Sequence, residues 1–82
     1  MKVKVGLVQM SCTENKQSNI TKAEEQIRKA AAEGASVVCL QELFASLYFC
    51  DVEDYANFDL AEAIPGSTTE RLSVLAKELS VV

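Results

Sequence analysis

Residues 2–10 alternate between apolar and polar or small side chains before they become apolar on both faces. Val3, Val5 and Leu7 fall on one face, and Val8 adds an apolar side chain to the other. This period of two predicts a β-strand. Because a strand that is apolar on both faces is typical of the middle of a sheet, we expect helices to cover it.

An apolar stripe at helical spacing, which includes Ile20 and Ile27, predicts a helix over residues 16–33. Asn15 is a suitable N-cap, and Gly34 suits the left-handed position that ends many helices. Residues 37–40 then form a short apolar run rich in β-branched side chains, which predicts a second strand. Strand, helix and strand with short joints predict a βαβ unit, in which the two strands are parallel.

Residues 43–66 form a long irregular stretch, and a loop of this length in a compact domain is often functional. Residues 67–70, Ser-Thr-Thr-Glu, match a capping box that would begin a second helix over residues 68–79. Residues 80–82 resemble the start of a third strand. The predicted class is therefore α/β, in the order strand, helix, strand, loop, helix, strand.

The chain has 82 residues, of which 49% are hydrophobic, more than so short a chain can cover alone. We therefore expect residues 1–82 to be the N-terminal portion of one larger, incomplete domain. The alternative is a small, non-catalytic α/β binding module that is complete at Val82. Three cysteines without a C-x-x-C spacing predict reduced thiols, and the sequence has neither a signal peptide nor a membrane span. These features predict a soluble, cytoplasmic protein.

The net charge of −4 and the absence of a basic run argue against nucleic-acid binding. The sequence has no histidine, which excludes a His-based triad and most zinc sites, and no Gly-rich phosphate loop follows the first strand. We therefore expect neither a metal nor another cofactor. Residues 30–70 contain no Lys or Arg but many carboxylates. This segment is either a solvated acidic loop or an acidic rim that attracts a cationic substrate.

Glu42 is the main candidate for chemistry. It directly follows the apolar strand of residues 37–40, and ligands bind at the carboxyl ends of strands in open α/β sheets. A carboxylate that is partly shielded there suits a general base that takes a proton from a thiol or a water. The alternative is a structural Glu that caps the next turn or pairs with a surface cation.

The other candidates are thiols and aromatic rings. We expect Cys39, inside the apolar strand, to lie in the core. Cys12 and Cys50 have no cation nearby in the sequence, so we assign neither as a nucleophile. Tyr48 and Phe49 either line a substrate pocket beside the strand ends or pack under the loop.

Several segments together resemble the nitrilase, or carbon–nitrogen hydrolase, superfamily over essentially the whole chain. These segments are the opening strand VKVGLVQM, Asn19-Ile20 in the first helix, GASVVCLQELF at residues 34–44, and Ile64-Pro65-Gly66 before the second helix. Gln41-Glu42-Leu43-Phe44 with Tyr48-Phe49-Cys50 is most similar to the N-carbamoylputrescine amidase branch.

This resemblance implies a four-layer αββα sandwich and hydrolysis of a non-peptide C–N bond by a Cys–Glu–Lys triad. Glu42 matches the general base of that triad, whereas its Cys and Lys would lie past Val82. The implied reaction converts N-carbamoylputrescine to putrescine, CO2 and ammonia in polyamine biosynthesis. The implied assembly is a homo-oligomer. The alternatives within the superfamily are a β-ureidopropionase and an ω-amidase.

Overall fold

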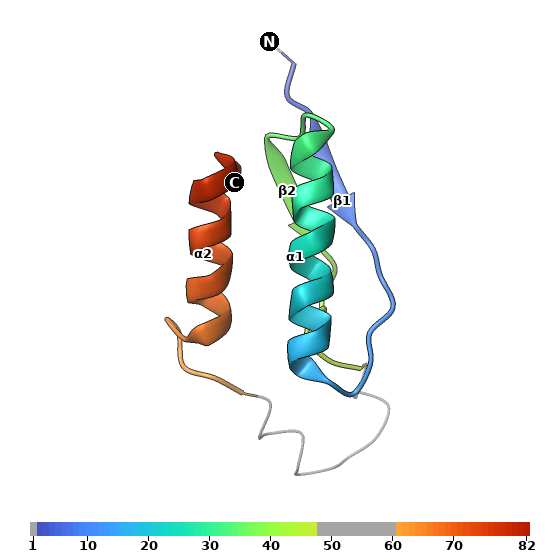
Figure 1. Cartoon of the computed structure of the whole chain (residues 1–82), viewed down its shortest axis with the longest axis vertical. Helices are drawn as coiled ribbons and strands as arrows, with labels where there is room; N and C mark the ends of the chain where they lie inside the picture. The colour runs from blue at the N-terminus through green and yellow to red at the C-terminus, as the bar shows by residue number, and fades with distance from the viewer. Residues whose placement is uncertain (1, 48–60) are drawn as a thin grey trace.

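The computed structural model describes residues 2–47 and 61–82. In chain order the elements of these residues are β1 (Val5–Val8), α1 (Lys16–Ala32), β2 (Val37–Leu40) and α2 (Ser67–Leu79). α1 lies against the sheet of β1 and β2, and α2 lies beside α1 and runs in the same direction (Figure 1). The α/β class and the order of these four elements were predicted from the sequence and are confirmed.

β1 and β2 are parallel, as the βαβ pattern predicts, with Val5 opposite Val37 and Val8 opposite Leu40. β1 is shorter than the predicted strand of residues 2–10. The reason is its partner, since β2 has only four residues and each ladder hydrogen bond needs a partner on the neighbouring strand.

Val82 begins a third line of pairing. Its N–H donates to the Ser36 carbonyl at 3.0 Å, and its carbonyl accepts the Val38 N–H at 2.8 Å. In a parallel pair, a residue forms hydrogen bonds with the two residues that flank its partner, and Val82 does so with the residues on either side of Val37. Because Val37 donates toward Lys4 on the β1 side, Val82 lies at the opposite edge of β2. This is the strand start that the sequence predicts for residues 80–82.

α1 forms where the sequence predicts it. The Asn15 side chain accepts the Ser18 N–H at 2.9 Å and so caps the first turn. Ile20 and Ala23 are fully buried on the face that packs against the sheet. The helix ends just before Gly34, whose φ of +99° is a conformation that glycine adopts without strain.

A second glycine lets α1 approach the sheet closely. A Cβ atom on Gly6 would lie 3.0 Å from the Ala30 Cβ and 3.3 Å from the Ala35 Cβ. Both distances are shorter than comfortable carbon–carbon contacts. A larger residue at position 6 would therefore push the end of α1 away from β1.

The opposite face of the sheet is bare in the described residues. Val3, Val5 and Leu7 are 56%, 52% and 80% exposed, although we expected cover on both faces of this strand. Cys39 is also exposed, so the prediction that it lies in the core is wrong for this chain. The reason is topological, because α1 and α2 leave this face uncovered and Cys39 pairs with Leu7 on it.

The two helices are joined by one buried side chain and by ion pairs. Leu75 of α2 is 3% exposed. Around it, Arg71 pairs with Glu24, and Arg28 pairs with Glu78. Exposed pairs contribute about 0.2–1 kcal/mol each. Burial of Leu75 therefore stabilises the contact between the helices more than either ion pair does, and the ion pairs mainly fix the register of the helices.

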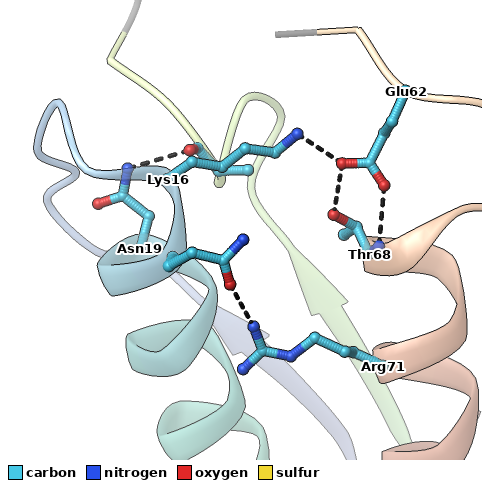
Figure 2. A network of polar contacts seen from close by, with 7 residues as sticks. Lys16, Asn19, Glu62, Thr68 and Arg71 are labelled. Atoms are coloured by element: carbon cyan, nitrogen blue, oxygen red, sulfur yellow. Dashed lines mark hydrogen bonds and ion pairs between the residues drawn. The ribbon is translucent and has the colours of Figure 1, made fainter.

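The cap of α2 differs from the prediction. The residue before the helix is Gly66, which has no side chain to accept a hydrogen bond, so the predicted capping box of residues 67–70 is wrong. Glu62 takes its place, because its carboxylate accepts the Thr68 N–H and the Thr68 hydroxyl, both at 2.8 Å. Figure 2 shows the same carboxylate paired with Lys16, at 2.5 Å.

These contacts lower the pKa of Glu62 from 4.5 to about 2, chiefly through the hydrogen bond from Lys16 and then through those from Thr68. Between these two pH values the unfolded chain binds more protons at this carboxyl group than the folded chain does. The stabilisation is therefore fully present above pH 4.5 and is lost as the pH falls toward 2.

We expect Glu62→Gln to lower the stability at neutral pH and to flatten its dependence on pH between about 4.5 and 2, because glutamine does not ionise. Denaturant unfolding at a series of pH values measures both effects. Glu70→Gln is the matched control, since it removes a carboxylate from the first turn of α2, the turn that Glu62 caps, without touching the Lys16 and Thr68 contacts. If both variants keep the slope of the original protein, the assigned role of Glu62 is wrong.

Candidate active site

The carboxyl ends of β1 and β2 lie side by side because the strands are parallel and in register. Their last residues and the residues that follow surround an open hollow of about 460 Å³, called here the carboxyl-edge hollow. It is lined by Leu7, Val8, Gln9, Met10, Cys39, Leu40 and Gln41. The sequence predicted a site at this edge, and the structure places a hollow there.

Gln41 ties the two strand ends together. Its Oε1 accepts the Met10 N–H at 2.7 Å, and its Nε2 lies 3.8 Å from the Cys12 sulfur. The Met10 N–H is thus satisfied by a side chain beyond the end of the ladder. Gln41 therefore fixes the point at which the chain leaves β2, one residue before Glu42.

Cys12 reaches the same segment from the β1 side. Its thiol donates to the Phe44 carbonyl, with 3.1 Å between sulfur and oxygen, and the Leu43 carbonyl is 3.8 Å away. The Cys12 side chain is half-buried and is occupied by these contacts with backbone carbonyls. This arrangement gives Cys12 a structural role, because it ties the chain after β1 to the turn after β2.

Glu42 lies in the turn that follows β2 and directly follows Gln41, but its side chain is exposed and does not line the carboxyl-edge hollow. This differs from the partial shielding that we expected. The described residues supply two strands with helix cover on one face, which is too little protein around this edge to shield a carboxylate. In this chain Glu42 is therefore presented to solvent beside the hollow.

The remaining candidates are not placed. Tyr48, Phe49 and Cys50 lie outside the described residues. Within residues 2–47 and 61–82, no group of three His, Cys, Asp or Glu side chains could hold a metal ion. Neither α1 nor α2, the helices of the described part of the chain, is long and apolar enough to cross a membrane.

Two side chains that support the site were not predicted from the sequence as part of it. One is Gln41, and the other is Asn19, which is 1% exposed on the buried face of α1. Its Nδ2 donates to the Ala45 carbonyl at 3.0 Å, three residues after Glu42. A polar residue next to Ile20 in an apolar stripe was the available signal, because a buried amide needs partners.

An α/β edge that presents a carboxylate next to a hollow has the layout of an enzyme site on a parallel sheet. The carbon–nitrogen hydrolase family profile matches residues 4–82, nearly the whole chain. The chain belongs to the carbon–nitrogen hydrolase family. The observed α/β order corresponds to the N-terminal part of the αββα sandwich of this family.

Individual relatives are similar along the same length. The chain is 43% identical over 82 residues to an N-carbamoylputrescine amidase of Oryza sativa and 38% identical over 78 residues to an omega-amidase of Mus musculus. It is 37% identical over 81 residues to a citrullinase of Francisella tularensis. These alignments cover 99%, 95% and 98% of this chain, but only 27%, 27% and 28% of the relatives.

We expect Gln41→Leu to destabilise the protein by about 1 kcal/mol, because it leaves the part-buried Met10 N–H without an acceptor. The control is Gln9→Leu, which changes another glutamine of the carboxyl-edge hollow and should stay within about 0.5 kcal/mol. Urea unfolding of both variants measures the difference. Equal losses would show that the Gln41–Met10 hydrogen bond contributes nothing specific.

Proposed function

We propose that residues 1–82 are the N-terminal portion of a single hydrolase domain that cleaves N-carbamoylputrescine to putrescine, CO2 and ammonia. The observation that carries this proposal is the similarity to N-carbamoylputrescine amidases, which reaches 43% identity and covers 99% of the chain, Glu42 included. The placement of Glu42 at the carboxyl edge supports the same proposal, because that edge is where an α/β sheet binds ligands.

In this proposal Glu42 is the general base. It takes the proton from a cysteine thiol, and the resulting thiolate attacks the carbonyl carbon. A thioester-type acyl-enzyme forms as the C–N bond breaks and Glu42 returns the proton to the departing nitrogen. Water then gives a proton to Glu42 and adds to the acyl carbon, and the cysteine departs as the free thiol. The released carbamic acid breaks down to CO2 and the remaining nitrogen product, and a lysine stabilises the oxyanion in both steps. The cysteine and lysine come from sequence outside this chain. The described thiols do not suit the role, since Cys12 donates to backbone carbonyls and Cys39 lies on the bare sheet face.

The distribution of charge also supports a carbamoylated amine as the substrate. Residues 30–70 contain Glu42 and seven other carboxylates but neither Lys nor Arg. An acidic surface attracts an ammonium group and raises its local concentration, whereas a substrate carboxylate would be repelled. Tyr48 and Phe49 are assigned to the wall of the substrate pocket on the same reasoning, since an aromatic face binds a cation favourably.

The second candidate is another amidase of the same family, favoured by the 38% and 37% identities to the omega-amidase and the citrullinase. A β-ureidopropionase belongs to the same group of alternatives. Rates of the complete enzyme on carbamoyl amines, carbamoyl β-amino acids, citrulline and ω-amides separate them. We also assign the protein to the cytoplasm, to polyamine biosynthesis and to a homo-oligomer. Fractionation, polyamine levels in a deletion strain and light scattering test these assignments.

We expect Glu42→Gln to lower kcat on N-carbamoylputrescine by about 10²–10⁴-fold with little change in KM, because the amide cannot accept the proton. Ammonia release by the complete enzyme measures this. Glu25→Gln, an exposed position on α1, is the control and should keep the original rate. A Glu42→Gln enzyme that retains full activity contradicts the assignment of the base.

We expect the isolated 82-residue polypeptide to release no ammonia from N-carbamoylputrescine above the rate in buffer. A base without its nucleophile does not form the thioester. The complete enzyme, assayed at the same concentration, is the positive control. Turnover by the isolated polypeptide at an enzyme-like rate would contradict the three-residue mechanism.

A further inference from the structure

The turn that presents Glu42 is held in place by contacts from elsewhere in the fold. Leu43, the next residue, has a φ of +56°, a left-handed conformation that is costly for a residue with a branched side chain. Such a conformation persists only where the surrounding structure over-determines it. The direction in which Glu42 points therefore depends on whatever anchors the chain on either side of Leu43.

The anchor after the turn is the amide of Asn19. It is 1% exposed, and it lies in the first turn of α1 (Figure 2). Its Oδ1 accepts the Thr13 N–H at 2.7 Å and lies 3.3 Å from the Thr13 hydroxyl. Its Nδ2 donates to the Thr13 carbonyl at 2.7 Å and to the Ala45 carbonyl at 3.0 Å.

Both N–H groups of this amide and its oxygen are thus in use. A buried network that is fully satisfied fixes one arrangement, because any displacement leaves a polar group without a partner. The amide itself cannot drift, since the neighbouring Ile20 is fully buried against the sheet. Asn19 therefore fixes the backbone at Ala45, three residues after Glu42, relative to the core between α1 and the sheet.

We propose that Asn19 is a positioning residue for Glu42: through the Ala45 carbonyl it holds the turn in the conformation from which the carboxylate meets its proton donor. The expected effect on catalysis rests on the proposed function, whereas the expected immobilisation of the turn rests on the structure alone. Gln41 holds the chain before the turn through the Met10 N–H, and Cys12 holds it just after Leu43 through the Phe44 carbonyl.

The test uses Asn19→Asp in the complete enzyme. Aspartate has nearly the same shape, but it loses the two N–H donors and places a carboxylate against the carbonyls of Thr13 and Ala45. Asn19→Ser is a second variant that avoids this charge. The control is Ile27→Val, which loosens the packing of the same helix at a buried position two turns away.

Two readouts are needed. Hydrogen exchange of the peptide covering residues 41–47 reports whether the turn is held. The values of kcat and KM report whether Glu42 is aligned. We expect exchange at least about 10-fold faster in both Asn19 variants and a kcat reduced about 10²-fold, with KM changed little, since a misplacement of about 1 Å costs this much. Ile27→Val should lower the melting temperature and leave both readouts unchanged.

Unchanged exchange in residues 41–47, or equal changes in Ile27→Val, overturns the positioning role while Glu42→Gln still decides the proposed function separately. If exchange is faster in the Asn19 variants but Glu42→Gln keeps the original kcat, Asn19 still holds the turn but Glu42 is not the base. In that case the proposed function has failed, and the catalytic part of this inference fails with it. If neither Asn19 variant folds, Asn19 is a structural residue only, and the positioning role is likewise overturned.

Discussion

The parallel pairing of β1 and β2 is the constraint on which the rest of the structure depends. Because both strands run the same way and end in register at Val8 and Leu40, the segments that follow them leave the sheet at one edge. A shift of one residue in the pairing of β1 with β2 would turn the side chains of one strand to the opposite face of the sheet. It would also move the residues that follow that strand away from their hydrogen-bond partners. The hydrogen bond from Met10 to Gln41 exists only in this register.

Local sequence signals predicted α1 and β2 well. The N-cap at Asn15 and the glycine at position 34 act within one turn of the helix ends, so neighbouring residues contain the information. The helix cap of α2 was predicted wrongly for the opposite reason. Glu62 replaces the expected capping box, and its other partner, Lys16, is 46 residues away in sequence, which no local pattern reveals.

The end of β2 was predicted correctly, whereas the exposure of Glu42 beyond it was not. Glu42 follows β2 as expected, yet its exposure depends on how much protein covers the edge, which the local sequence does not specify. The bare face of Val3, Val5 and Leu7 has the same origin. Covering such side chains contributes roughly 1.5–3 kcal/mol each. The second sheet of the αββα sandwich supplies this kind of cover in the family fold.

The stretch between Ala45 and Glu62 starts and finishes on a single turn of α1. Asn19 holds one end and Lys16 the other. The closure entropy of such a stretch rises by only about 0.6 kcal/mol when its length doubles. Insertions, deletions and substitutions between these two attachment points can therefore accumulate while the sheet and helices stay as they are.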